Sequence, residues 1–337
     1  MAASHNLPDA KLAAKLADLE LVERATSSRL ARWQSQFPGA RTREALLALA
    51  DASAFLDLPV QDVLPKAEPD AAATKQIFVR AITYANKTIA KLPNFYAKRT
   101  TTHFDDMSTL ERIRTHYAEN SSLMRKSLAP DTGARAPLTR IGDPSSVVVT
   151  YRDGREVEQP QPGSGKKTDS SEIGLTSRDE FGPILALVIT DSMHGKLFWE
   201  RWEQGENGPL AVFSYLVSQE ISHFTVSVTG IIPPNPSYHG EIAVDPESGT
   251  ILRVTLVTDY KPPFQASEAA IQVEYGPVQI GNATYTCPLK GVALSKVSSA
   301  GAADANGRSP ASSVQTRVND VTFTEYHVFR GEVRIVP

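Results

Sequence analysis

Carboxylates close to a histidine are the first candidates for chemistry in this sequence. His103 stands just before the adjacent pair Asp105 and Asp106, and Glu200 and Glu203 form a second acidic pair. Paired carboxylates can hydrolyse glycosidic bonds, and a carboxylate beside an imidazole can transfer protons in a hydrolase. A hydrolase that uses Glu200 or Asp105 with His103 is therefore one hypothesis, although nothing in the spacing sets the separation of these groups.

Other chemical motifs are incomplete. Glu220 precedes His223 by three positions, but a di-iron site needs two such copies on helices, and this copy starts a predicted strand. Cys287 is the only cysteine, and the segment 163–168 lacks the spacing of a phosphate-binding loop. The sequence therefore predicts no catalytic residue, no metal site and no cofactor, and it leaves enzymatic activity open.

Aromatic and apolar residues make a stronger candidate for a binding site. Strand-like alternation over residues 197–202 predicts Phe198 and Trp202 on one face and Trp199 on the other. One face can pack on a neighbouring apolar helix, while the other needs a cover, which is either a second domain or a ligand. The candidate ligand-binding residues are Phe198, Trp199, Trp202, Leu185 and Ile189.

Residues 1–92 are predicted to form a helical segment. Apolar residues spaced three and four apart predict one helix from Asp9 to Phe37, ended by Pro38-Gly39. A second helix is expected from its cap Thr42 to Phe55, and a third from its cap Asp70 to Leu92. The short, punctuated helices indicate a small bundle.

Residues 93–337 change to the pattern of an antiparallel β domain. A strand is expected at Asn94–Phe104, and Asp153-Gly154 predicts a hairpin between residues 147–151 and 155–158. Ser177–Met193 is expected to be a helix that is apolar on all sides. Further strands are expected at Lys196–Gln204, Leu210–Gln219, His223–Thr229, Glu241–Asp245, Ile251–Thr258, Ala269–Tyr275, Ala283–Cys287, Val292–Val297 and Val314–Val336. Together they predict an α+β fold, in which a strongly curved antiparallel sheet or open barrel surrounds the helix 177–193.

Composition excludes several functional classes. The chain has 337 residues and a net charge of −3, whereas a nucleic-acid binder would need a basic surface. No apolar run reaches the roughly 18 residues of a membrane span, and a single cysteine excludes an internal disulfide. The first residues have neither the basic nor the apolar region of a signal peptide, so we expect none in the chain as given.

Two stretches resemble known proteins. Leu92–Asp106, together with Ala48–Asp57, resembles a family of uncharacterised exported bacterial proteins whose members usually carry a signal peptide. Tyr238–Arg253, a strand, an Asp-Pro-Glu-Ser-Gly turn and a returning strand, is similar to the lipoprotein-carrier fold of LolA and LolB. The first resemblance implies an exported or periplasmic location, and the second implies an apolar pocket for acyl chains.

These observations favour a non-enzymatic envelope protein that binds an apolar or lipid-like ligand or a partner protein. The alternatives are a structural or interaction module without a small ligand, and the hydrolase described above. A cavity of roughly 300 Å³ or more would favour the ligand-binding hypothesis, whereas a filled core would favour the interaction module.

Overall fold

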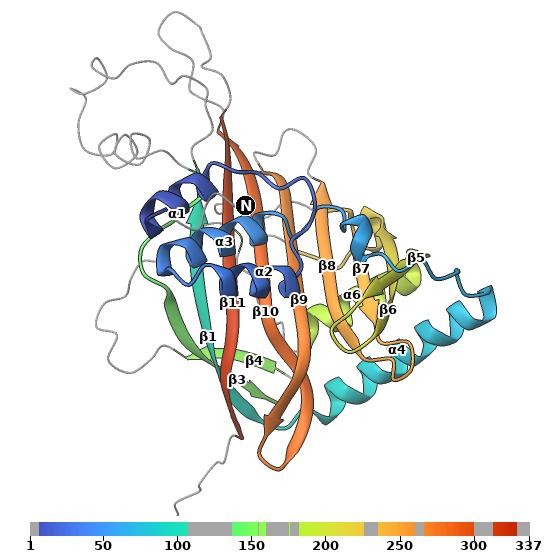
Figure 1. Cartoon of the computed structure of the whole chain (residues 1–337). Helices are drawn as coiled ribbons and strands as arrows, with labels where there is room; N and C mark the ends of the chain where they lie inside the picture. Colours follow the sequence, from blue (N-terminus) through green and yellow to red (C-terminus); the bar gives the residue numbers. More distant parts are fainter. Residues whose placement is uncertain are drawn as a thin grey trace, which may run out of the picture.

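The computed structural model describes residues 7–106, 137–153, 155–159, 175, 182–225, 235–259, 266–299 and 313–328. Within them, helices and one large antiparallel sheet form an α+β fold (Figure 1). The helices are α1 (Asp9–Ala17), α2 (Ser27–Gln36), α3 (Ala40–Ala52), α4 (Ala71–Lys91) and α6 (Pro183–His194), with short 3₁₀ turns η1 (Val60–Asp62) and η3 (Gln219–Ile221). None of these described helices has the length and apolar character needed to cross a membrane.

The strands follow one another closely along the chain. They are β1 (Phe95–Asp105), β2 (Thr139–Arg140), β3 (Ser145–Arg152), β4 (Arg155–Gln159), β5 (Lys196–Gln204), β6 (Pro209–Val217), β7 (Tyr238–Val244), β8 (Ile251–Asp259), β9 (Ala266–Ile280), β10 (Ala283–Ser299) and β11 (Ser313–Val328). Their order in the sheet is β4-β3-β1-β11-β10-β9-β8-β7-β6-β5, and β2 pairs with β1 outside this path. The sheet is not closed, because β4 and β5 stand at opposite ends of this order. The predicted hairpin is confirmed, since β3 and β4 pair antiparallel on either side of Asp153.

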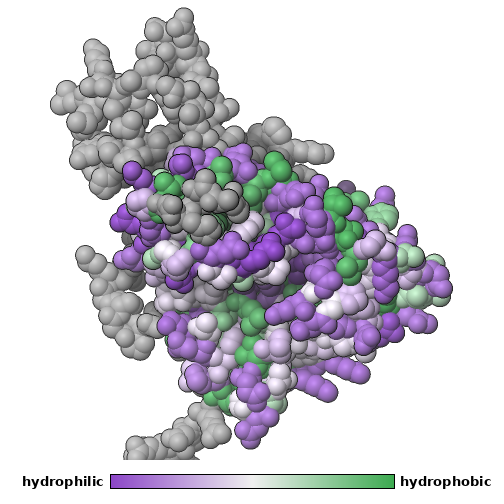
Figure 2. Space-filling view, in the orientation of Figure 1, coloured by the Kyte–Doolittle hydropathy of each residue, from purple (hydrophilic) through white to green (hydrophobic). Residues whose placement is uncertain are grey.

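Helices cover both faces of the sheet. On one face, called here the core face, α4 and α6 pack on the apolar side chains of β5–β9. On the other face, called the cap face, α3 and the residues just after it pack on β9, β10 and β11. This cluster includes Ala48, Ala54, Ala270, Val292, Leu294 and Val318. Residues 7–62, which carry α1–α3 and lie on the cap face, are called the cap (Figure 1). Figure 2 shows mainly hydrophilic residues over this side of the molecule, with hydrophobic residues in separate patches.

The chain passes from one face to the other around strand β5. Val63 forms an isolated β-bridge with Glu203, and the backbone N–H of Leu64 donates to the carbonyl of Trp202 at 2.9 Å. The indole N–H of Trp202 then donates to the carbonyl of Ala67 at 2.9 Å. These contacts cover one end of an edge strand and lead the chain to α4, which begins beyond Asp70 as predicted. The Asp70 side chain accepts the backbone N–H of Ala73 at 2.7 Å.

The single helix predicted from Asp9 to Phe37 is wrong. The structure has α1 and α2 instead, separated by residues 18–26. In this connection, the N–H of Arg24 donates to the carbonyl of Asp57 at 2.8 Å, and the N–H of Ala25 donates to Ser53 Oγ at 3.0 Å. Tertiary hydrogen bonds thus replace the helical ones, although the apolar spacing is compatible with a continuous helix.

The N-terminal capping of helix α3 also differs from the prediction. The helix starts at Ala40, and Thr42 lies in its first turn rather than before it. Asp9 of α1 reaches across and accepts the N–H groups of Arg41 at 3.1 Å and Thr42 at 2.9 Å. A Cβ atom on Gly39 would lie 2.1 Å from Asp9 Oδ1, so this approach requires glycine. A side chain of one helix therefore caps the next and docks α1 against α3.

Two predicted strand boundaries are corrected. The separate strands expected at Ala283–Cys287 and Val292–Val297 form one strand, β10, with a register shift between Pro288 and Lys290. Proline is tolerated at such a bulge because it needs no ladder hydrogen bond there. The strand expected from His223 is absent over residues 223–225, and its remainder lies outside the described residues.

Candidate functional site

A cavity of about 370 Å³ lies between the cap and the sheet. Its walls come from α1, the connection after α1, α3, residues 137–138, and strands β10 and β11. Apolar side chains line most of it, among them Leu16, Leu19, Ala48, Ala52, Leu138 and Leu294. The volume falls in the range of roughly 300–1,000 Å³ that is typical of small-molecule sites.

The wall formed by α1 is held differently from the wall formed by α3. No residue of α1 is fully buried, whereas α3 buries Leu46, Ala48, Leu49 and Ala50. The Asp9 carboxylate ties α1 to the start of α3, as described above. The cavity therefore has one wall embedded in the core and one wall attached at the surface.

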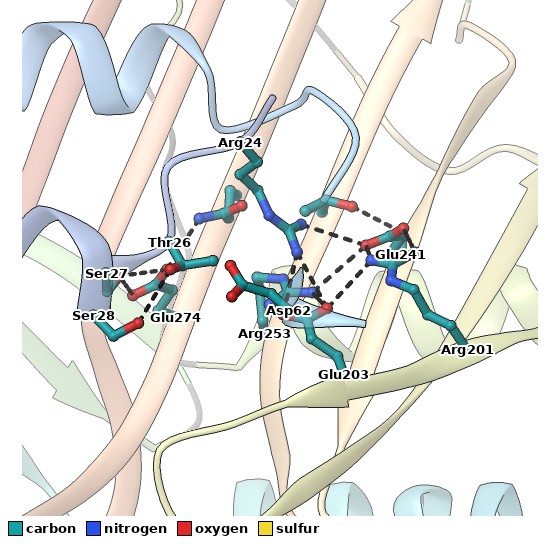
Figure 3. A network of polar contacts seen from close by, with 12 residues as sticks. Arg24, Thr26, Ser27, Ser28, Asp62, Arg201, Glu203, Glu241, Arg253 and Glu274 are labelled. Atoms are coloured by element: carbon teal, nitrogen blue, oxygen red, sulfur yellow. Dashed lines mark hydrogen bonds and ion pairs between the residues drawn. The ribbon is translucent and has the colours of Figure 1, made fainter. Parts of the chain in front are cut away.

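A cluster of three arginines and two glutamates fixes the cap to the sheet (Figure 3). We call it the arginine–glutamate cluster, and its members are Arg24, Arg201, Glu203, Glu241 and Arg253. Arg24 comes from the cap and the other four from β5, β7 and β8. Four members form two bidentate pairs, Arg253 with Glu203 at 2.7 and 2.8 Å and Arg201 with Glu241 at 2.6 and 2.8 Å. Figure 3 shows Arg24 descending from the cap onto these pairs, where it donates to Glu203 at 3.1 and 3.2 Å.

Burial makes the charges in this cluster interdependent. The side chains of Arg24 and Glu203 are 6% and 4% exposed. Burial alone would raise the pKa of Glu203, but the charge and hydrogen bonds of Arg253, with Arg24 and Arg201, outweigh it and lower the pKa to about 2. Removal of one partner would therefore leave a buried charge without compensation.

A second cluster joins α3 to the sheet. The ammonium of Lys290 on β10 lies 2.6 Å from Asp51 Oδ1 on α3 and 3.3 Å from Asp320 Oδ1 on β11. We call these residues the Asp51–Lys290–Asp320 cluster. Burial raises the pKa of Asp51 well above its ordinary value, Lys290 opposes this shift, and Asp320 adds to it. Two carboxylates share one cation, so Asp51 retains a proton more readily than an exposed aspartate would.

The predicted aromatic face is partly wrong, because strand β5 contains a bulge. The register of β5 against β6 shifts between Trp199 and Arg201. The extra residue places Trp199 and Trp202 on the same face, with their ring centroids 4.9 Å apart, instead of on opposite faces. The same shift turns Arg201 and Glu203 to the cap face, where they join the arginine–glutamate cluster.

Four of the five predicted ligand-binding residues meet in the main core. Leu185 and Ile189 of α6 are buried there together with Trp202, and Trp199 packs against the same cluster. Trp199 also contacts Phe213 edge-on at 5.7 Å. Phe198 lies outside this core cluster, and its side chain is 48% exposed. The cavity described above lies on the other face of the sheet and uses none of these residues.

Of the candidate catalytic residues, His103 and Glu200 lie apart, whereas Asp105 lies two positions after His103 on the same strand, β1. His103 is on β1 and Glu200 on β5, and strands β6–β11 separate them along the sheet. His103 Nδ1 lies 2.7 Å from the amide oxygen of Asn319, and Asp106 accepts the N–H of Thr316 at 2.8 Å. Burial raises the pKa of the Cys287 thiol to about 12, which makes the nucleophilic thiolate rare at neutral pH.

Glu220 and His223 do not form the ligand pair that their spacing allows. His223 instead turns to Asp191 of α6, with Nδ1 2.6 Å from Asp191 Oδ1. The other Asp191 oxygen accepts the His223 N–H at 2.9 Å and the Tyr238 hydroxyl at 2.8 Å. Within the part of the chain that the structure describes, no three His, Cys, Asp or Glu side chains gather in the manner of a metal site.

Sequence reasoning missed Asp191 and most of the arginine–glutamate cluster. The sequence contains a signal for each of them, which is a charged residue within an apolar segment. Asp191 is the sole charged residue in the apolar run from Ile184 to Met193, and Glu241 and Arg253 interrupt apolar strands. A charged residue in such a position needs a buried partner, but the sequence does not name that partner.

Comparisons with known proteins assign neither a family nor a function to this chain. No family model, curated protein or solved structure matches the chain.

Proposed function

We propose that this protein binds a small apolar or lipid-like molecule in the cavity between the cap and the sheet. The single observation that carries the proposal is a cavity of about 370 Å³ lined mainly by leucine and alanine. A preformed space of this size, with leucine and alanine as most of its lining residues, can bury the apolar part of a ligand that leaves water. A role in the bacterial envelope belongs to the same proposal and rests on the resemblance to exported bacterial proteins. An open-barrel arrangement of the sheet around α6 is also proposed, and it rests on the resemblance to lipoprotein carriers.

Two observations support a ligand at this place rather than at the aromatic strand. Trp199 and Trp202 are in contact with each other, and the indole N–H of Trp202 is bound to Ala67, so these side chains already have partners. The cavity wall formed by α1 has no fully buried residue, which leaves that wall able to adjust to a ligand.

The alternative is an interaction module, in which the cap closes the sheet face and a protein partner binds elsewhere. The two ionic clusters favour this alternative, because they attach the cap at several points and would hold it without any ligand. A ligand-binding experiment separates the two functions.

Filling the cavity should abolish most of the binding. Ala52 lines the cavity and is only partly buried, so Ala52→Phe can place a ring in this space. Displacing even two methylene groups of a ligand costs about 1.6 kcal/mol, so we expect the affinity for N-phenylnaphthylamine, a neutral apolar fluorescent probe, to fall by at least about tenfold. The measurement is a fluorescence titration of the delipidated full chain.

The matched control is Ala40→Phe, the same substitution at the exposed start of the same helix. It should bind the probe as the wild type does. The proposal fails if the wild type shows no saturable binding, or if Ala52→Phe and Ala40→Phe bind the probe equally well. In that case the interaction module becomes the leading function.

A further inference from the structure

Strand β5 is the last strand at one end of the described sheet (Figure 1). Among the residues that the structure describes, the chain pairs with the outer edge of β5 at two positions. Val63 forms its bridge with Glu203, and the N–H of Leu64 donates to the carbonyl of Trp202. Both positions lie in the second half of the strand, and the first half, Lys196–Glu200, is called here the open edge. The backbone groups along such an edge can pair with a strand of another molecule.

Two apolar side chains lie exposed beside the open edge. Phe198 pairs with Ser214 of β6, and Lys196 pairs with Leu216. Since residues two apart on a strand share a face, Phe198 and Leu216 are neighbours on the same face of the sheet. They are 48% and 49% exposed, so the cap leaves both side chains in contact with solvent. A strand added at the open edge would bury part of this apolar surface.

The order of charges along the open edge is complementary to itself. Lys196 and Glu200 are both exposed, have opposite charges and lie equally far from Phe198. In an antiparallel pair of two copies centred on Phe198, Lys196 of each copy stands opposite Glu200 of the other, and the two Phe198 rings are cross-strand neighbours. Leu197 then stands opposite Trp199, and both of these side chains already pack on the main core of their own copy.

This arrangement is compatible with the occupied half of the strand. Because β5 begins at Lys196, the paired strand of the second copy ends opposite Glu200. Trp202, where Leu64 occupies the edge, lies two residues beyond that point. The bulge that follows Trp199 falls at the end of the paired segment, so the register before it is regular.

We propose that two copies of this chain associate through the open edges of β5, which joins their sheets across a two-fold axis at Phe198. The partner is a second copy rather than an unrelated strand, because the charges of the open edge match their own sequence in the antiparallel direction. Only Lys196–Glu200 of each copy pair, so the interface is small and the dimer should form at about 10–100 µM protein. The proposal does not depend on the cavity or on its ligand.

Sedimentation velocity of the full chain, over about 1–200 µM, tests the dimer. We expect a monomer at the lowest concentration and a reversible dimer at the highest. Lys196→Glu and Glu200→Lys each place like charges opposite one another twice in every dimer, so each should weaken association by at least about tenfold. The charge-swapped variant K196E/E200K restores both pairs and should dimerise as the wild type does. An equal mixture of the two single variants should form a heterodimer, because one copy then has two acids and the other two bases.

The matched control is Lys11→Glu, the same charge change at an exposed lysine of α1, which should leave association unchanged. Circular dichroism should show the same unfolding transition for every variant, since the substituted side chains are exposed. A wild type that stays monomeric throughout the range overturns the proposal, and Lys196 and Glu200 then protect the edge from pairing, as charges on edge strands do. The proposal is also overturned if the dimer persists in both single variants, or if either the charge-swapped variant or the mixture fails to restore it.

Discussion

Replacement of Glu203 with alanine is expected to lower the free energy of unfolding by about 3–5 kcal/mol, the cost of breaking a buried ion pair on one side. Glu203 accepts hydrogen bonds from Arg24, Arg201 and Arg253, and its side chain is only 4% exposed. Without it, Glu241 alone would face three buried guanidinium groups. Urea unfolding followed by circular dichroism measures the loss.

The control lies on the same strand. Glu200 is exposed at the bulge of β5, so Glu200→Ala should change the free energy of unfolding by less than about 0.5 kcal/mol. The double variant E203L/R253L removes both partners of one bidentate pair, and it should cost clearly less than the sum of the two single variants. Equal losses for Glu203→Ala and Glu200→Ala would show that the arginine–glutamate cluster contributes no stability.

Glu203 should also contribute to the loss of folding stability at acidic pH. The pKa of Glu203 is lowered to about 2 from its ordinary value of 4.5. A lowered carboxyl pKa means that the folded state binds the proton less readily, so this stabilisation is complete above pH 4.5 and disappears as the pH falls towards 2. Glu203→Gln cannot titrate, so its unfolding free energy should fall less steeply than that of the wild type across this window.

The general fold and some local signals could be predicted from the sequence. Asp70 caps α4, Asp153 lies between paired strands, and residues 196–204 form β5, because each depends on neighbours within a few positions. The single helix from Asp9 to Phe37 could not be corrected in this way. Its break depends on hydrogen bonds from Arg24 and Ala25 to residues near the end of α3, which only the folded chain brings close.

The candidate site was harder to predict for the same reason. The connection after α1, which the sequence did not predict, lines part of the cavity, and the other walls come from segments far apart in the sequence. The position of Trp202 depended on one bulged residue, since a shift of one position moves every later side chain to the other face. The pairing of Arg24 with Glu203 spans 179 positions, and no local pattern marks two charges as partners over that distance.

Lys290→Met should lower the free energy of unfolding at neutral pH by about 3–5 kcal/mol, as much as the loss of Glu203. The size of this loss should depend strongly on pH. The substitution leaves Asp51 and Asp320, whose side chains are 2% and 4% exposed, close to one another without their cation. Burial and Asp320 already raise the pKa of Asp51, and removal of the opposing lysine charge raises it further. A raised carboxyl pKa gives stability at low pH that is lost as the pH rises through the folded-state value. The variant should therefore lose less stability, relative to wild type, at pH 5 than at pH 7.5, as measured by urea unfolding at both values.

Two further variants distinguish a charge effect from a loss of packing. D51N/K290M removes one of the two carboxylates and should recover more than half of the loss at pH 7.5, since a single acid remains to be accommodated. Lys98→Met breaks the exposed pair with Glu325 and should cost less than about 1 kcal/mol at either pH. If Lys290→Met is equally unstable at both pH values and Asp51→Asn gives no recovery, then Lys290 acts through the packing of its aliphatic chain. In that case α3, and with it the inner wall of the cavity, is held by apolar contacts such as Ala48 against Leu294 rather than by the buried charges.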